Sequence, residues 1–113
     1  MTIYIGFSTK THKTIAQIVC HKYKHCAPIK IMRNKVIIYQ FVNYKKIVAI
    51  TIRKQDLEKL KLFGWTFIQY KPSITDKDIL KIRAITCVNF TKRVCRIRNM
   101  KIQTPDALFR YLQ

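Results

Sequence analysis

Acidic side chains, chain-breaking residues and long apolar runs are all scarce in this chain of 113 residues. Asp and Glu total 5 against 23 Lys and Arg, which gives a formal net charge of +18 at pH 7. Only two glycines and three prolines occur, so low-complexity and collagen-like chains are excluded. No apolar run approaches the roughly 20 residues of a transmembrane helix, so we expect no integral membrane association.

The N-terminal residues also lack the pattern of a secretory signal. Met1 to Ile5 contains no basic region ahead of an apolar run, and no small-residue cleavage site follows. We therefore predict no signal peptide and reduced thiols in a cytoplasm, although the four cysteines would permit two disulfides. The apolar content of 49% and the chain length indicate one folded domain covering residues 1–113.

The basic side chains are spread from one end of the chain to the other. A positive field of this strength concentrates polyanions at the protein surface. We expect a partner such as nucleic acid, an anionic cell-wall polymer, acidic lipid headgroups or an acidic protein. The alternative is a generally basic surface that has no dedicated partner.

The apolar periodicity predicts an α+β fold in which helices flank an antiparallel sheet. Strands are predicted at residues 2–7, 27–31, 36–42, 46–52 and 65–70. The second to fourth form a three-stranded meander, with Asn34-Lys35 as its first turn. A helix with apolar residues Ile15, Ile18 and Val19 is predicted to end near Tyr23.

Three further segments have helical signals. Residues 53–62 are predicted to form a helix that ends at Gly64, with Leu57 and Leu60 facing inward and Leu62 as a further inward candidate. Residues 73–81 are predicted to form a helical turn or loop. Thr104, Pro105 and Asp106 are the cap, first-turn proline and first-turn acid of a closing helix over residues 105–112.

Residues 84–96 contain the best candidate for a reactive side chain. Thr86 can cap a helix, and apolar residues follow at near-helical spacing, so a helix is predicted to begin at or beside Cys87. Free N–H groups, the helix dipole and nearby basic side chains all favour a thiolate there. The alternative is that Cys87 is a small buried hydrophobe, as we expect for Cys95 farther along the same helix.

A thiolate nucleophile needs a base, and His25 is the best placed of the three histidines. It stands at the entrance to a strand, from which its ring can project over the end of the sheet. Such a base is usually oriented by a third polar group, for which Gln40 and Asn43 are the uncharged candidates. We favour Gln40, because an inward amide within an apolar strand needs a partner, although it could instead face solvent.

Three stretches carry a resemblance to a known family: residues 24–29 (Lys-His-Cys-Ala-Pro-Ile), 86–93 (Thr-Cys-Val-Asn-Phe-Thr-Lys-Arg) and 104–112 (Thr-Pro-Asp-Ala-Leu-Phe-Arg-Tyr-Leu). The first two resemble the circularly permuted NlpC-type papain-like cysteine hydrolases, in which the histidine strand precedes the cysteine helix. The last resembles the closing helix of small phage-encoded members. The resemblance covers most of the chain, from Ile5 to Leu112.

This resemblance implies a permuted papain-like domain with Cys87 as nucleophile, His25 as general base and acid, and Gln40 as the orienting residue. The implied reaction is hydrolysis or acyl transfer at an amide or ester carbonyl through a thioester, on a substrate such as a cell-wall peptide. The chain departs from the family at Lys24, which replaces an aromatic residue or serine before the histidine. The alternative is a catalytically silent, basic phage protein that serves in a virion or binds nucleic acid.

Two other arrangements are less consistent with the residues. Cys20, His21, His25 and Cys26 include the side chains that zinc prefers, but their spacing fits no standard knuckle, so we expect no metal and no cofactor. Aromatic residues alternate with lysines in several segments, which is one pattern of nucleic-acid binding. Because Trp65 and Phe67 alternate as core residues of a strand do, we interpret them as an aromatic core.

Overall fold

The five strands form one antiparallel sheet in the order β4-β3-β2-β1-β5. The computed structural model describes residues 3–9, 23–43, 46–71 and 75–113. The predicted helix containing Ile15, Ile18 and Val19 lies outside the described residues. In chain order the elements are β1 (Ile3–Ser8), β2 (His25–Ile31), β3 (Lys35–Asn43), β4 (Lys46–Arg53), α2 (Asp56–Leu62), β5 (Trp65–Tyr70), α3 (Asp76–Leu80), α4 (Cys87–Cys95) and α5 (Pro105–Leu112).

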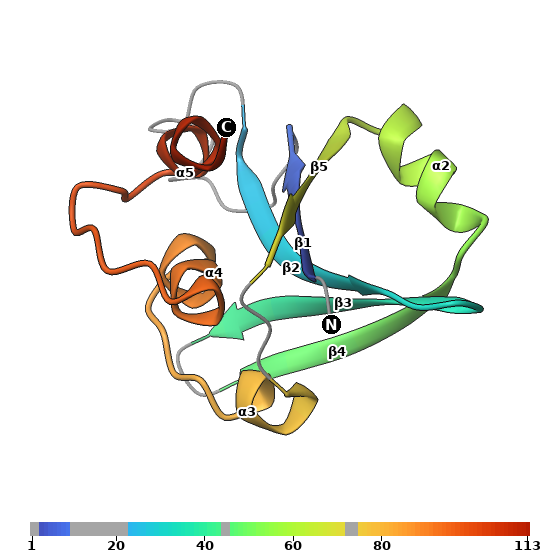
Figure 1. Cartoon of the computed structure of the whole chain (residues 1–113), viewed down its shortest axis with the longest axis horizontal. Coiled ribbons are helices and arrows are strands. Elements are labelled where there is room, and N and C mark those ends of the chain that lie inside the picture. Colours follow the sequence, from blue (N-terminus) through green and yellow to red (C-terminus); the bar gives the residue numbers. More distant parts are fainter. Residues whose placement is uncertain (1–2, 10–22, 44–45, 72–74) are drawn as a thin grey trace.

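The predicted meander is present as β2, β3 and β4. Residues Ile29–Ile31 pair with Val36–Ile38, and the N–H of Met32 donates to the carbonyl of Lys35 to close the turn. The turn is therefore centred on Arg33-Asn34, one residue before the predicted pair Asn34-Lys35, because Lys35 already belongs to β3. The β3–β4 pairing continues much farther, from Lys35–Arg53 to Asn43–Lys46. The β2–β3 pairing therefore occupies only the hairpin end of these strands, and the two strands diverge beyond it (Figure 1).

Strand β1 lies between β2 and β5 and supplies the centre of the core. Ile3, Ile5 and Phe7 are fully buried on one face of the sheet. Gly6 faces the other side, where a Cβ atom would lie 2.7 Å from Ile29 Cδ1 and 2.8 Å from the Trp65 ring. Glycine at this position thus lets the indole of Trp65 pack directly against the backbone of β1.

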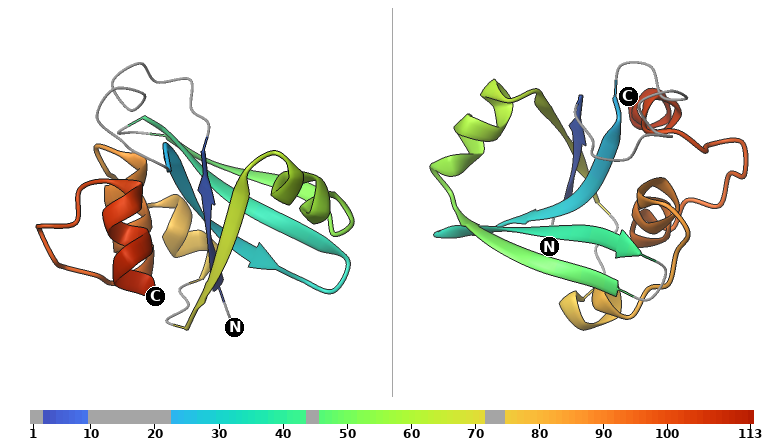
Figure 2. Two further views of the ribbon diagram at one scale, coloured as in Figure 1. Left: turned by 90° about the horizontal axis from the view of Figure 1, so that it is seen from above. Right: turned by 180° about the vertical axis from the view of Figure 1, so that it is seen from behind.

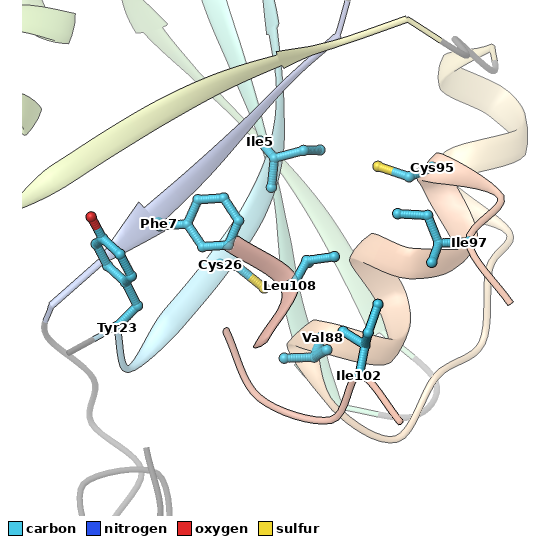
Figure 3. Packing of buried hydrophobic residues seen from close by; sticks show 9 residues of the cluster. All are labelled: Ile5, Phe7, Tyr23, Cys26, Val88, Cys95, Ile97, Ile102 and Leu108. Atoms are coloured by element: carbon cyan, nitrogen blue, oxygen red, sulfur yellow. The ribbon is translucent and has the colours of Figure 1, made fainter. Parts of the chain in front are cut away.

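Helices cover both faces of the sheet (Figures 1 and 2). Leu57 and Leu60 of α2 pack on the face that carries Ala27 and Ile29. Helices α4 and α5 cover the opposite face. Figure 3 shows the cluster buried there, which consists of Ile5, Phe7, Tyr23, Cys26, Val88, Cys95, Ile97, Ile102 and Leu108. The α+β prediction, with a meander and two further strands, is therefore confirmed.

Two details of α2 differ from the prediction. The helix begins at Asp56 because Arg53 still belongs to β4, where it pairs with Lys35. The prediction of Leu62 as an inward residue is wrong: its side chain is 86% exposed, because two residues after Leu60 a side chain lies about 200° around the helix and faces the opposite side. Gly64 adopts φ +97°, as a helix-terminating residue does.

The predicted starts of the last two helices are confirmed. The Thr86 hydroxyl accepts a hydrogen bond from the N–H of Asn89, and the Thr104 hydroxyl accepts one from the N–H of Ala107. Arg96 is the C-terminal cap of helix α4. Its φ is 59°, and among the described non-glycine residues it alone has a left-handed backbone. Of the two options given for residues 73–81, a helical turn or a loop, the helical one is observed as the short helix α3.

Candidate active site

Cys87 is the first residue of α4. Its position follows from the Thr86 cap, because the hydroxyl of Thr86 satisfies the N–H of Asn89 and starts the helix one residue later. Val88, on the buried face of the helix, fixes α4 against the sheet. By helix geometry the first N–H groups have no carbonyl partner within the helix, so they surround the Cys87 sulfur with partial positive charge.

His25 is the first residue of β2 and is half-buried. It pairs with Ser8 of β1, which anchors its backbone at the end of the sheet. The Trp65 ring stands at 89° to the imidazole, with the ring centroids 6.1 Å apart. Trp65 therefore limits how far the imidazole can swing away from α4.

Gln40 contacts the imidazole from β3. Its amide nitrogen lies 2.9 Å and its amide oxygen 3.3 Å from His25 Nε2. The two residues stand beyond the paired part of β2 and β3, so a side-chain hydrogen bond joins the strands where the backbone pairing has ended. Of the two placements considered for Gln40, the inward one is observed. With Nε2 engaged, the second ring nitrogen of His25 is the one left for Cys87.

The environment of Cys87 favours its ionised form. Its pKa is lowered to about 4, chiefly by a hydrogen bond from the Cys26 thiol. Burial opposes this shift, whereas a hydrogen bond and positive charge from His25 reinforce it. The structure thus brings together Cys87 of α4, His25 of β2 and Gln40 of β3, and the lowered pKa of Cys87 favours its thiolate form at neutral pH.

Cys26 and Thr91 are components of this site that the sequence analysis missed. The Cys26 sulfur lies 3.5 Å from the Thr91 hydroxyl, and that hydroxyl donates to the carbonyl of Cys87 at 2.8 Å. Burial raises the pKa of Cys26 well above its usual value, and the neighbouring Cys87 raises it further. Cys26 therefore remains a thiol and can donate to Cys87. The available signal was strand alternation: Cys26 pairs with Phe7, which faces the α4 side of the sheet, so Cys26 faces that side too.

The other sequence candidates have different positions. Cys95 is buried near the opposite end of α4, where burial raises its pKa to about 12, consistent with the predicted core role. Cys20 and His21, from the zinc alternative, lie outside the described residues. Within the described residues no group of three His, Cys, Asp or Glu side chains could hold a metal ion.

Several of the described aromatic residues lie in or against the core. Trp65 and Phe67 are half-buried and stack with ring centroids 6.2 Å apart on the α2 face of the sheet. Tyr39 is fully buried, and Tyr23 is buried against Phe7. Trp65 and Phe67 therefore pack against the core, as interpreted, and at the same time line a hollow of about 570 Å³ beside Leu57 and Lys61.

A basic surface lies at the far end of α4 from Cys87. Arg93 and Arg98 line two adjacent hollows of about 540 and 370 Å³, and Arg96 lines the larger one together with Asp78. Within the described part of the chain these arginines form no ion pair, whereas the acidic residues of α2 pair with neighbouring basic side chains. We call Arg93, Arg96 and Arg98 the arginine surface.

Comparisons with known proteins supply no relative. No protein-family model, curated protein or solved structure matches the chain. Within the described residues, no helix combines the length and apolar content needed to cross a membrane. Function therefore has to be inferred from the side chains of the site.

Proposed function

We propose that this protein is a cysteine hydrolase or acyl transferase of the permuted papain-like type, with Cys87 as nucleophile, His25 as general base and acid, and Gln40 as the orienting residue. The observation that carries the proposal is the chain of contacts from Gln40 through the His25 ring to Cys87 at the start of a helix. A nucleophile, a base and an orienter linked in this way are the general signature of covalent catalysis.

The first half of the reaction forms a thioester. The Cys87 thiolate attacks the carbonyl carbon of an amide or ester, and the carbonyl oxygen becomes negatively charged. The N–H groups of Cys87 and Val88 at the start of α4 can donate to that oxygen. The His25 imidazolium gives its proton to the leaving amine or alcohol as the tetrahedral intermediate collapses.

The second half releases the acyl group. Neutral His25 removes a proton from water, or from an acceptor hydroxyl or amine, which attacks the thioester carbonyl. Cys87 leaves as a thiolate, which the hydrogen bond from Cys26 stabilises. Gln40 holds the imidazole in one orientation through both halves. The order of the chain, with His25 before Cys87, agrees with the resemblance to the permuted family and with a small phage-encoded member.

An activated ester tests the proposal without knowledge of the natural substrate. On addition of p-nitrophenyl acetate, we expect a burst of p-nitrophenolate and an acetyl group on Cys87, detected by mass spectrometry of the intact and digested protein. Cys87→Ala should abolish both signals. His25→Ala should slow both acylation and release, whereas Cys95→Ala, on the same helix, serves as the matched control and should retain them.

The cleavage products identify the acylated residue without ambiguity. Trypsin releases Cys87 in the peptide 84–92, which contains no other cysteine, and Cys95 in the peptide 94–96. An acetyl group found on lysines alone, or acylation of Cys87 at the same rate with and without His25, would contradict the assigned roles. Cell-wall peptides and lipid esters can then be compared as substrates.

A second candidate function is the binding of a polyanion without catalysis, for example as a component of a virion. The net charge of +18 and the arginine surface favour it. Binding through phosphate contacts should weaken steeply with salt, by a slope of about 0.9 per contact in a double-logarithmic plot. Replacing Arg93 and Arg98 with Gln should lower this slope. Replacing Lys59 and Lys61, whose side chains pair with acidic residues of α2, provides a control of equal charge.

The two candidates make separate predictions. Cys87→Ala should leave polyanion binding unchanged, because Cys87 lies at the opposite end of α4 from the arginine surface. Equal losses from the arginine and lysine pairs would indicate general charge attraction and not a defined surface. Both functions can belong to one protein, for example a hydrolase held on an anionic cell-wall polymer.

A further inference from the structure

The site contains two thiols in direct contact, which hydrolysis alone does not require. The Cys26 thiol donates a hydrogen bond to the Cys87 sulfur, and both are held by Thr91, whose hydroxyl contacts the Cys26 sulfur and the Cys87 carbonyl. Cys26 is 1% exposed, whereas Cys87 is only partly buried. One thiol is thus reachable from solvent, and the other stands behind it within the protein.

We propose that Cys26 and Cys87 form an oxidation site, in which a peroxide oxidises Cys87 and Cys26 then closes a disulfide between β2 and α4. The proposal goes beyond the proposed function, because it depends on the two sulfur atoms and not on any substrate. Oxidation would withdraw the nucleophile, and a reducing thiol would restore it.

The chemistry balances with hydrogen peroxide as the oxidant. The Cys87 thiolate attacks one peroxide oxygen, the O–O bond breaks, and Cys87 sulfenic acid and hydroxide form. The Cys26 sulfur then attacks the Cys87 sulfur, the S–O bond breaks, and the leaving hydroxide takes the Cys26 proton as water. Peroxide accepts two electrons, and the two sulfur atoms lose one each.

The geometry selects this pair over the other described cysteine. A disulfide needs two sulfur atoms about 2 Å apart on Cα atoms within about 7 Å. Neighbouring elements β2 and α4 already hold the Cys26 and Cys87 side chains in hydrogen-bond contact, so the two sulfur atoms lie close together. Cys95 is eight residues farther along α4, which corresponds to about 12 Å of helix rise and excludes a bridge to Cys87.

Peptide mapping after peroxide treatment tests the proposal. We expect the intact protein to lose two hydrogen atoms and to yield a linked peptide pair, 25–30 with 84–92, after tryptic digestion without reductant. Dithiothreitol should separate the pair and restore alkylation of Cys87. Peroxide that leaves Cys26 as a free thiol while Cys87 gains two or three oxygen atoms would overturn the proposal, as would linkage of Cys87 to Cys20.

Two variants test whether Cys26 itself reacts with the sulfenic acid of Cys87. In Cys26→Ala the sulfenic acid has no thiol within reach among the described residues, so Cys87 should gain two or three oxygen atoms and resist reduction. Cys95→Ala should still form the linked pair. Circular dichroism verifies folding, and if Cys26→Ala does not fold, the linkage in the native chain decides alone. Because no substrate is used, a negative result leaves the hydrolase proposal standing, and a positive one does not depend on it.

Discussion

The pH dependence of Cys87 alkylation gives the most direct test of its electrostatic environment. Because the pKa is lowered to about 4, Cys87 stays ionised from pH 5.5 upward, and its rate of reaction with iodoacetamide should be nearly constant between pH 5.5 and 8. A free thiol with a pKa of about 8.5 should instead react about tenfold faster for each pH unit over this range.

Two opposing factors set the size of the difference. At pH 5.5 an ordinary thiol is about 0.1% ionised and Cys87 almost fully, which is a ratio of about 1,000. A thiolate of lower pKa is also a weaker nucleophile. With a Brønsted coefficient of about 0.45, a pKa difference of roughly 4.5 lowers the rate constant of the thiolate about 100-fold. Before any effect of burial, Cys87 should be about tenfold faster than the free thiol at pH 5.5 and about 50-fold slower at pH 8.5.

The assay follows each cysteine separately. Trypsin places Cys20, Cys26, Cys87 and Cys95 on four different peptides, so alkylation of each can be timed by mass spectrometry in one sample, with glutathione as the reference thiol. Cys26→Ala should steepen the pH profile of Cys87 more than His25→Ala, because the Cys26 hydrogen bond is the largest cause of the lowered pKa. A native profile that rises tenfold per pH unit would refute the reasoning.

Three stability predictions test the framework around the site, each by thermal or urea denaturation. Thr86→Ala removes the cap of α4 and should cost about 1 kcal/mol. Gly6→Ala places a methyl group 2.8 Å from the Trp65 ring and should cost about 1–3 kcal/mol; an unchanged midpoint would mean that the ring moves freely. Phe90→Ala empties a fully buried position and should cost about 3–5 kcal/mol, whereas the exposed Phe63→Ala should cost less than about 0.5 kcal/mol.

The parts of the fold that could be predicted from the sequence depend on local chemistry. Thr86 and Thr104 mark helix starts because a hydroxyl cap acts on an N–H group three residues later. The hairpin turn after Ile31 and the left-handed Gly64 are likewise set by neighbouring residues. Leu62 was misjudged because its apolar side chain was given more weight than helical spacing, which turns it away from Leu57 and Leu60.

The proximity of the candidate residues was predictable, and their surroundings were not. His25 and Gln40 could be related because one hairpin separates them, and hairpin geometry limits where the second strand returns. The contact of Cys26 with Cys87 depends on the packing of β2 against α4, two elements about 60 residues apart in sequence. The position of Trp65 beside His25 depends on the absence of a side chain at Gly6, a feature of packing that no local pattern reveals.

The backbone of Arg96 reveals a trade between two properties of the molecule. A left-handed conformation costs a residue with a side chain about 1 kcal/mol relative to glycine, so Arg96 keeps its charge at the expense of folding free energy. A glycine there should raise the free energy of unfolding and, under the proposed polyanion function, weaken polyanion binding. A search for higher thermal stability would therefore favour glycine at this position, whereas a search for tighter polyanion binding would favour arginine.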